Sequence, residues 1–230
     1  MDDSKWERYS ALGGVAFAVL IAVAGFLPGS PPKTTDSAAK IARFFTDHGD
    51  AIRWSAYLGG LGTITALWWS GAVWRLLRRA EGGIPRLAVV ALGGIVFAAV
   101  MATLGGVIAA VVVQDRVFGS QTTKFFYVAF NNITAATGFG IAAFLTAFAA
   151  VIIRSGVLPR VLGWLGGIDA LAFVVGSAAV ASNRDVFFVV SFVAFIGFLL
   201  WVLVVSVLMY RALTRPPTPA VATMAASAAA

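Results

Sequence analysis

The chain has 230 residues, of which 60% are hydrophobic and only 12% are charged. Soluble domains average roughly 25% charged residues, so this composition argues against a soluble fold. The sequence has no cysteine and a single histidine, His48, which excludes disulfides, iron–sulfur clusters and thiolate or bis-histidine metal centres. We therefore expect no cofactor. The net charge of +7 comes from cations near the ends of apolar runs, where charge orients a membrane protein and need not bind nucleic acid.

The apolar runs predict an all-α polytopic membrane protein that folds as a bundle of six transmembrane helices. A run of about 20 residues crosses the hydrocarbon core as a helix, which pairs its own backbone groups. A polar cytoplasmic N-terminus, residues 1–10, precedes a transmembrane domain that covers residues 11–210. The six expected spans cover residues 11–27, 54–74, 87–113, 125–153, 161–181 and 186–209. The cytoplasmic tail, residues 211–230, has no polar–apolar period and is expected to be disordered.

The first apolar run has a second interpretation, as a signal peptide. Ala22-Val23-Ala24 resembles the small-residue site at which signal peptidase cleaves. The apolar run nevertheless continues through Leu27, which favours a retained span. Both interpretations remain open.

The first loop, residues 28–53, is expected to lie outside the cytoplasm and to contain a short amphipathic helix over residues 36–48. One face of this helix is apolar and consists of Ala38, Ile41, Ala42 and Phe45. Ser37 or one of the two residues before it caps the start of the helix. The helix is expected to lie at the interface and cover the ends of the spans. Alternatively, it is a lid over a pocket, with Asp47 and His48 as polar gates.

Basic residues predict which ends of the spans face the cytoplasm. Ten lysines and arginines lie on the side of the two termini and seven on the side of the first loop. Since cytoplasmic loops carry the excess of basic residues, both termini are expected in the cytoplasm of a bacterium, with the bundle in its inner membrane.

Two segments of the chain are similar to each other. GGIPRLAVVALGGI, at residues 82–95, matches GVLPRVLGWLGGI, at residues 156–168, after a shift of one residue. Either two helical hairpins are repeated in the same orientation, or short cytoplasmic turns simply share Gly, Pro and Arg.

Several stretches together carry a resemblance to a known family. They are DSAAKIARFFTDH in the first loop, AYLGGLG and RLLRRAEGG at the two ends of the second span, and RSGVLPRVLGWLG before the fifth. Over residues 35–176 the chain resembles an uncharacterised family of actinobacterial polytopic inner-membrane proteins, a domain of unknown function. The resemblance implies a membrane-embedded bundle and no particular activity. It implies an apolar residue at Asp169, so it gives no support to a role for that residue.

Asp169 is the acid that falls inside an expected span. It follows Arg160 by nine positions, which places it about 13 Å into the membrane from the cytoplasmic side. An ionised carboxylate at this depth is costly unless it is paired, so we expect it to be neutral or hydrogen-bonded. Small residues near it allow another helix to approach closely, and the expected packing glycines are Gly163, Gly166, Gly167 and Gly176.

Polar residues of two other spans lie at a depth comparable with that of Asp169. They are Asn131 and Thr134 in the fourth span and Thr63 in the second. These four side chains are expected to form one polar layer near the midplane. The layer would serve either as hydrogen-bonded glue between helices or as a site that handles protons or a solute.

The sequence does not specify a biochemical activity. It contains no Walker loop, no GxSxG and no HExxH, and one buried acid is too little for acid–base catalysis, so an enzyme is not expected. The favoured interpretation is an accessory or structural membrane component. Its partners would be the lipid bilayer and a second copy or another membrane protein, and not nucleic acid. The alternative is a small transporter or channel-like subunit that uses the polar layer around Asp169.

Overall fold

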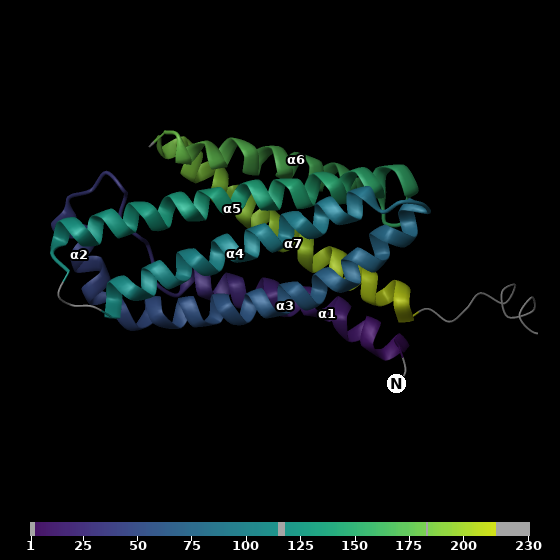
Figure 1. Ribbon diagram of the computed structural model, residues 1–230, viewed down its shortest axis with the longest axis horizontal. Helices are drawn as coiled ribbons and strands as arrows, with labels where there is room; N and C mark the ends of the chain where they lie inside the picture. Colours follow the sequence, from purple (N-terminus) through teal and green to yellow (C-terminus); the bar gives the residue numbers. More distant parts are fainter. Residues whose placement is uncertain (1–2, 115–117, 183, 215–230) are drawn as a thin grey trace, which may run out of the picture.

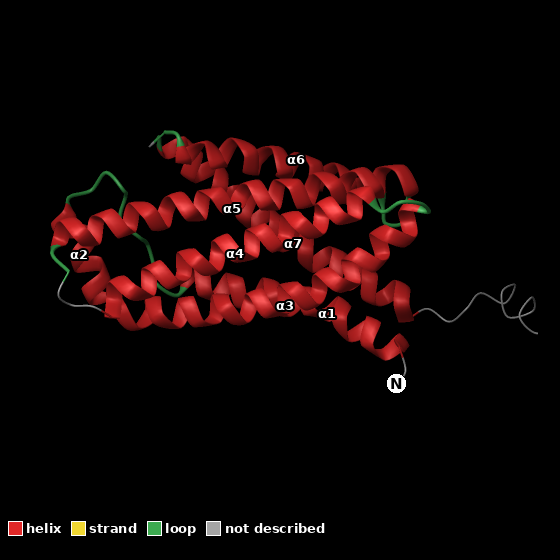
Figure 2. Ribbon diagram, in the orientation of Figure 1, coloured by secondary structure: helices red, strands yellow, loops and turns green. Residues whose placement is uncertain are grey.

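The computed structural model describes residues 3–114, 118–182 and 184–214, and the side chains of residues 9–211 within those ranges. Every element in the described chain is a helix (Figure 2), which confirms the all-α prediction. The elements are α1 (Asp3–Phe26), α2 (Ala38–Asp47), α3 (Gly49–Glu81), α4 (Arg86–Gln114), α5 (Ser120–Ser155), α6 (Arg160–Ser177), the 3-10 helix η1 (Ala178–Val180) and α7 (Asp185–Thr214).

Five of the described helices are long and apolar enough to cross a membrane: α1, α4, α5, α6 with η1, and α7. They indicate a multi-pass membrane protein. The remaining long helix, α3, was expected to contain the second span but does not reach the same hydropathy. Its middle third, LGGLGTITALWWS, interrupts the aliphatic residues with glycine, threonine and tryptophan. Composition therefore supports five of the six expected spans directly.

The helices extend beyond most of the expected spans, because a helix continues into water until a residue ends it. α1 begins at Asp3, inside the segment expected to be a polar N-terminus, and α7 runs to Thr214. Gly82 and Gly156 adopt positive φ angles of 65° and 68° at the ends of α3 and α5, a conformation that glycine adopts without strain. α6 is shorter than expected and gives way to η1 after Ser177.

The tail was expected to be disordered, and its residues beyond Thr214 lie outside the described part of the chain.

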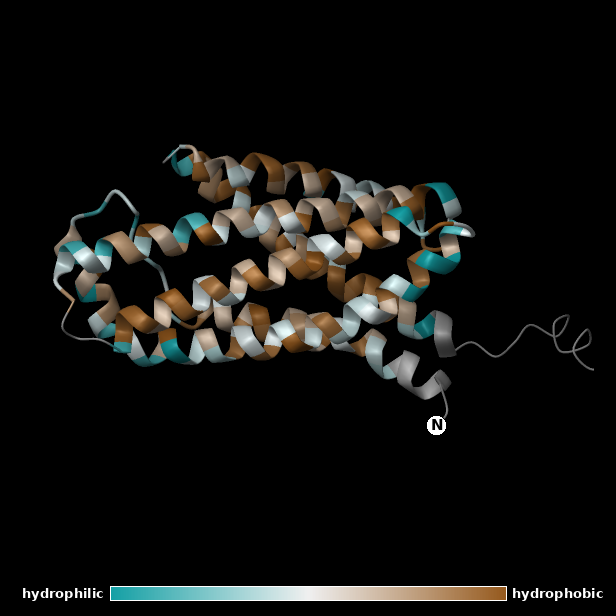
Figure 3. Ribbon diagram, in the orientation of Figure 1, coloured by the Kyte–Doolittle hydropathy of each residue, from teal (hydrophilic) through white to brown (hydrophobic). Residues whose placement is uncertain are grey.

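The six long helices run back and forth along the bundle and close into a ring in the order α1, α3, α4, α5, α6, α7 (Figure 1). The end that carries α2 is called the cap end. The opposite end is called the arginine end, after Arg75, Arg78, Arg79, Arg86, Arg154, Arg160 and Arg211. The start of α1 and the end of α7 both lie at the arginine end. Hydrophilic residues gather towards the two ends, and hydrophobic residues predominate along the helices between them (Figure 3).

Aromatic side chains fill the centre of the ring from its middle towards the arginine end. Phe144 of α5 contacts Trp69 of α3 and Trp201 of α7, with ring centroids 5.8 and 6.1 Å apart. Phe148 meets Trp201 edge to face at 4.9 Å, and Phe198 contacts Phe144 at 6.3 Å. These five residues are called the aromatic core. Each such pair contributes about 0.5–1.5 kcal/mol beyond the area that it buries.

Burial is concentrated in the same half of the bundle. α5 has two buried residues between Ser120 and Thr137, and eleven between Gly138 and Ser155. In α7, the described residues become buried only from Ala194 onward. α5 and α7 are thus packed tightly towards the arginine end and more loosely towards the cap end.

The backbones of α4 and α5 approach each other most closely at a pair of glycines. A Cβ atom added to Gly94 would lie 2.6 Å from the Gly140 carbonyl oxygen and 2.7 Å from the Phe144 nitrogen. A Cβ atom on Gly140 would in turn lie 2.6 Å from the Gly94 carbonyl oxygen. The contact therefore excludes any side chain on either helix and positions Phe144 in the aromatic core.

We predict that Gly94→Ala lowers the thermal unfolding temperature of the purified protein, because the added methyl group forces α4 and α5 apart. Overpacking of this kind costs about 1–3 kcal/mol. Gly93→Ala is the matched control, since no atom lies within 4 Å of a Cβ added there. Alanine favours a helix over glycine, so the control should unfold at the same temperature or slightly higher. Equal losses in both variants would contradict the described contact.

Candidate functional site

The amphipathic helix α2 packs its apolar face on the bundle. The Ser37 hydroxyl caps the helix by accepting a hydrogen bond from the Lys40 N–H at 3.3 Å. Ile41 and Phe45 are buried against residues of α3, α4 and α5. The Phe45 ring meets Tyr127 of α5 edge to face at 5.8 Å. Because this face meets protein, α2 is a fixed part of the fold at the cap end.

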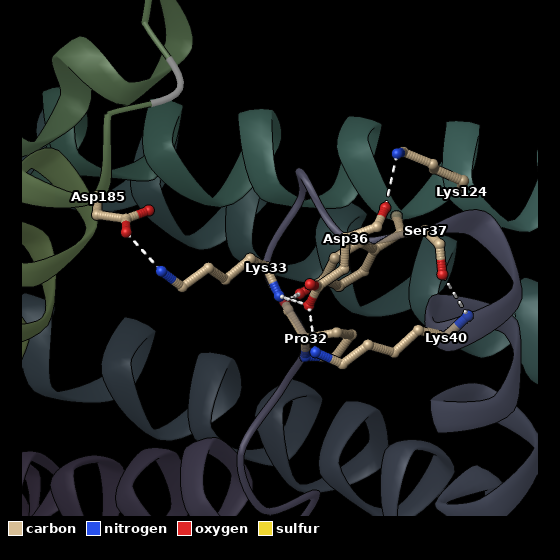
Figure 4. A network of polar contacts seen from close by, with 8 residues as sticks. Pro32, Lys33, Asp36, Ser37, Lys40, Lys124 and Asp185 are labelled. Carbon is tan, nitrogen blue, oxygen red and sulfur yellow. Dashed lines mark hydrogen bonds and ion pairs between the residues drawn. The ribbon is translucent and has the colours of Figure 1, made fainter.

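Polar contacts from α5 fasten the segment that precedes α2. The Tyr127 hydroxyl donates a hydrogen bond to the Pro32 carbonyl oxygen at 2.5 Å. Lys124 Nζ donates to the Asp36 carbonyl oxygen at 2.7 Å (Figure 4). Residues 28–48 are called the cap, since they lie at this end of the bundle and α5 binds them at two points.

A third attachment joins the cap to α7. Lys33 Nζ forms an ion pair with Asp185 Oδ2 at 2.5 Å, at the first residue of α7 (Figure 4). The Asp36 carboxylate holds the loop in shape by accepting from the Lys33 N–H and pairing with Lys40 Nζ, both at 2.9 Å. The Lys33 and Asp185 side chains are about two-thirds exposed, at 65% and 66%. Water and salt screen such a pair, so this clasp holds the cap only weakly.

The charges of the cap shift the pKa values of two of its groups. The hydrogen bond to Lys40, together with that from the Lys33 N–H, lowers the pKa of Asp36 below its ordinary value of 3.8. The stability that the ionised Asp36 carboxylate contributes is therefore fully present at pH values above the ordinary aspartate pKa. It is lost as the pH falls through the lowered pKa of Asp36. The hydrogen bond to Asp185 raises the pKa of Lys33 above its ordinary value of 10.5. The stability that the charged Lys33 side chain contributes is therefore lost only as the pH rises through this raised pKa.

The residues expected to gate the cap lie apart from these contacts. His48 connects α2 to α3, stacks on Phe44 at 4.6 Å, and places its Nδ1 atom 3.1 Å from the Phe44 carbonyl oxygen. Asp47 is exposed at the end of α2.

No local sequence pattern identifies the residues that attach the cap. Lys33 and Asp185 are 152 positions apart, and Tyr127 and Pro32 are 95 apart. Lys124 lies about one turn into α5 and Tyr127 about two turns. The apolar pattern of the sequence placed Lys124 at the edge of the fourth expected span and Tyr127 inside it. Only the assembled bundle brings these residues to one end.

The residues of the expected midplane layer take separate partners in the structure. Asn131 Nδ2 donates to the Tyr127 carbonyl oxygen of its own helix at 2.8 Å. Thr63 donates to the Gly59 carbonyl oxygen and lies 3.2 Å from the Thr103 hydroxyl of α4. Thr134 is exposed on α5. No hydrogen bond within the described chain joins any of the three to Asp169.

Asp169 lies at the seam between α6 and α7. A Cβ atom added to Gly197 of α7 would lie 3.0 Å from Asp169 Oδ1, so the carboxyl group rests where α7 has no side chain. Its Oδ2 atom is buried and has no hydrogen-bond partner among the described residues. The nearest buried donor on α7, Trp201 Nε1, is already bonded to the Leu162 carbonyl oxygen at 2.9 Å.

Two other buried polar atoms lack a partner, but these lie beside each other. Trp69 Nε1 and Ser206 Oγ both border Gly14 of α1, since a Cβ atom added there would touch both. A small rotation lets the serine hydroxyl accept from the indole N–H. Asp169 has no such neighbour.

Three of the four expected packing glycines lie at helix contacts. Gly163 faces Ile153 of α5, Gly166 faces Trp201, and Gly176 faces Ser191. Gly167 differs from the expectation, because no atom lies within 4 Å of a Cβ added there. It lies away from the other helices of the chain.

The described residues contain no group of three or more side chains of the His, Cys, Asp and Glu types that could hold a metal ion. Comparison with known proteins gives no match, since no family model, no curated protein and no solved structure is similar to this chain.

We predict that the cap stays attached between about pH 5 and pH 9 and loosens in acid or in strong base, because the pKa of Asp36 is lowered and that of Lys33 is raised. A spin label at the exposed residue Ala39 of α2 should give the same line shape across that range. It should become more mobile as the pH falls below the ordinary aspartate pKa of 3.8. Asp36→Asn is the control and should be more mobile at neutral pH, with a smaller response to acid. A change in mobility between pH 5 and pH 9 would be inconsistent with the clasp.

Proposed function

We propose that the protein is a six-span accessory or structural component of a bacterial inner membrane, not an enzyme, and that its bundle is closed to solutes. The aromatic core is the observation that carries this proposal. Trp69, Phe144 and Phe148 are each no more than 1% exposed where α3, α5 and α7 meet. A path for ions or polar solutes would have to cross this region, where tightly packed rings leave little room and where Trp69 Nε1 and Ser206 Oγ are isolated polar atoms among apolar side chains.

The position of α3 supports the sixth span. α1 ends at the cap end and α4 begins at the arginine end, so the chain between them must return along the bundle (Figure 1). α3 makes this return, and its 33 residues extend about 50 Å, more than the roughly 30 Å of a hydrocarbon core. Ile64, Leu67 and Trp68 are exposed in its middle, as expected of a face that meets lipid.

The distribution of charge supports an arginine end in the cytoplasm. The described side chains at that end include seven arginines and one acid, Glu81, whose carboxylate caps α4 by accepting from the N–H groups of Leu87 and Ala88. At the cap end, six lysines and arginines are offset by four aspartates. Cytoplasmic ends carry the excess of basic residues, so both termini would be inside and the cap outside.

We predict that residues on either side of α3 react from opposite faces of the membrane. The natural chain has no cysteine, so single substitutions report directly. Ser30→Cys, in the cap, should react with a membrane-impermeant maleimide in intact cells. Gly83→Cys, after α3, should react only once the membrane is permeabilised. Reaction of both from the same face would contradict the sixth span.

The cap supports a role in binding other membrane components. It holds a defined arrangement of lysines and aspartates at the outer end, fixed to α5 and α7, in place of a loose loop. The alternative, a small transporter or channel-like subunit, would need a polar path from the loosely packed cap half to the arginine end. That path would meet the aromatic core.

We predict that the purified protein, reconstituted into liposomes, passes protons and alkali cations no faster than protein-free liposomes do. The physical reason is the cost of moving an ion through a dry aromatic core. A pH-sensitive dye inside the vesicles, with an imposed gradient, measures the flux. Asp169→Asn should give the same baseline. A flux in the natural protein that this substitution abolishes would favour the transporter instead.

A further inference from the structure

Four arginines form an arc of positive charge along the rim of the arginine end. They lie on four helices that follow one another around the ring (Figure 1): Arg78 near the end of α3, Arg86 at the start of α4, Arg154 near the end of α5, and Arg160 at the start of α6. All four side chains are exposed. They are called the arginine arc. Since the four helices are neighbours, the positive charge extends from one helix to the next.

The chain provides little negative charge beside the arginine arc. Glu81 is the one acid among the described side chains of this end, and its two carboxylate oxygens accept from the N–H groups of Leu87 and Ala88. No ion pair within the described chain includes a member of the arc. Arg78 contacts the Trp74 ring, with its guanidinium carbon 5.2 Å from the ring centroid, and this contact leaves the positive charge in place. The arc is therefore available to an anion from outside the chain.

Tryptophans place the arginine arc at the depth of lipid headgroups. Trp54 and Trp74 of α3 are about 30 Å apart along the helix, which is the thickness of a hydrocarbon core. Trp54 is exposed and Trp74 is partly exposed, as expected of tryptophans at the two membrane–water interfaces. Arg78 follows Trp74 by one turn, and on α6 Arg160 precedes the exposed Trp164 by one turn. The guanidinium groups therefore lie close to the plane of the lipid phosphates.

An apolar surface continues from the arginine arc along the outer side of two helices. On α4, the exposed Val89 lies one turn after Arg86. On α6, the exposed Val161 and Trp164 follow Arg160. The surface thus combines cationic groups with an apolar area beside them. A ligand that fits both parts has an anionic group attached to hydrocarbon.

We propose, on the basis of the membrane-spanning arrangement described above, that the arginine arc binds the phosphate groups of anionic phospholipids in the cytoplasmic leaflet. Their acyl chains lie against the exposed apolar side chains of α4 and α6. A guanidinium group donates two parallel hydrogen bonds and so matches a phosphate group. Every described cation at this end is an arginine, whereas three of the six at the cap end are lysines. Basic groups beside membrane spans attract the anionic lipids of the cytoplasmic leaflet.

A phospholipid fits the arginine arc better than an acidic segment of another protein does. Such a segment would approach from the water and pair with the arginines, but it would make no use of the apolar surface around Val161 and Trp164. Free phosphate lacks an apolar part in the same way. The arc also extends over four neighbouring helices, which suits a row of lipids and not one compact ligand.

The test measures which lipids contact the full chain in vesicles made of equal amounts of anionic phosphatidylglycerol and zwitterionic phosphatidylcholine. A spin label on the acyl chain reports, by electron paramagnetic resonance, the fraction of each lipid whose motion the protein restricts. We expect the natural protein to prefer phosphatidylglycerol about twofold or more, since a gain of about fivefold for each basic residue is averaged over all lipids around the bundle. The absence of a preference would overturn the proposal in favour of an acidic protein segment.

Two double variants test whether the arginine arc causes the preference. Arg154→Gln with Arg160→Gln should lose most of it, because both positions belong to the arc. Arg43→Gln with Arg53→Gln removes the same charge from exposed positions at the cap end and should keep the preference. An equal preference in the two double variants, or a loss in the cap-end variant alone, would contradict the proposal.

A salt titration of the natural protein gives a second measurement that does not depend on the folding of any variant. The preference should fall as sodium chloride is added, because ions screen exposed charges, and a preference independent of salt would contradict the proposal. Restriction of neither lipid would contradict the membrane-spanning bundle itself, whereas equal restriction of both would contradict only the binding of anionic lipid. The two leaflets of the vesicles have the same composition, so the result does not depend on which end faces the cytoplasm.

Discussion

Contact between aromatic rings of α3, α5 and α7 is the interaction on which the rest of the bundle depends. Ring closure brings Trp69, Phe144 and Trp201 together from segments more than 130 residues apart in the chain. The rings reach one another because α4 and α5 approach to backbone contact at Gly94 and Gly140, which lets Phe144 point into the centre. Between helices in lipid there is little hydrophobic driving force, so packing of this kind must supply the stability.

The cap and the aromatic core are held in place by different kinds of contact. The core is made of large buried rings, whereas the cap is attached by Tyr127, Lys124 and an exposed ion pair. Helix burial follows the same gradient along α5. The bundle is thus packed firmly around the aromatic core, while α5 buries fewer of its residues at the cap end.

The sequence predicted those features that follow from local periodicity. The apolar runs located the helices, and the i, i+3, i+4 pattern of Ile41 and Phe45 located α2 and its buried face. Hydropathy alone did not support α3 as a span, because its tryptophans and glycines lower the average. The path of α3 along the bundle, between α1 and α4, supports it as a span where its composition does not.

The polar contacts were beyond prediction for a different reason. Depth along a helix placed Asp169, Asn131 and Thr63 at similar heights, but depth does not fix the direction in which a side chain points around the helix axis. Asn131 and Thr63 bond to carbonyl oxygens of their own helices, as short polar side chains commonly do, and need no distant partner. Asp169 instead lies at the α6–α7 seam. Its buried Oδ2 atom has no hydrogen-bond partner among the described residues.

The central claim, a bundle sealed at its arginine end, is tested most directly by the reactivity of single cysteines along α5. Alanine positions make closely matched sites: Ala129 and Ala136 are partly exposed in the cap half of α5, and Ala142, Ala147 and Ala149 are buried in its other half. In native membranes, a small water-soluble thiol reagent added to both sides should react measurably with the first two and not with the last three. Reaction at Ala142, Ala147 or Ala149 at a rate like that of the cap half would contradict the sealed core.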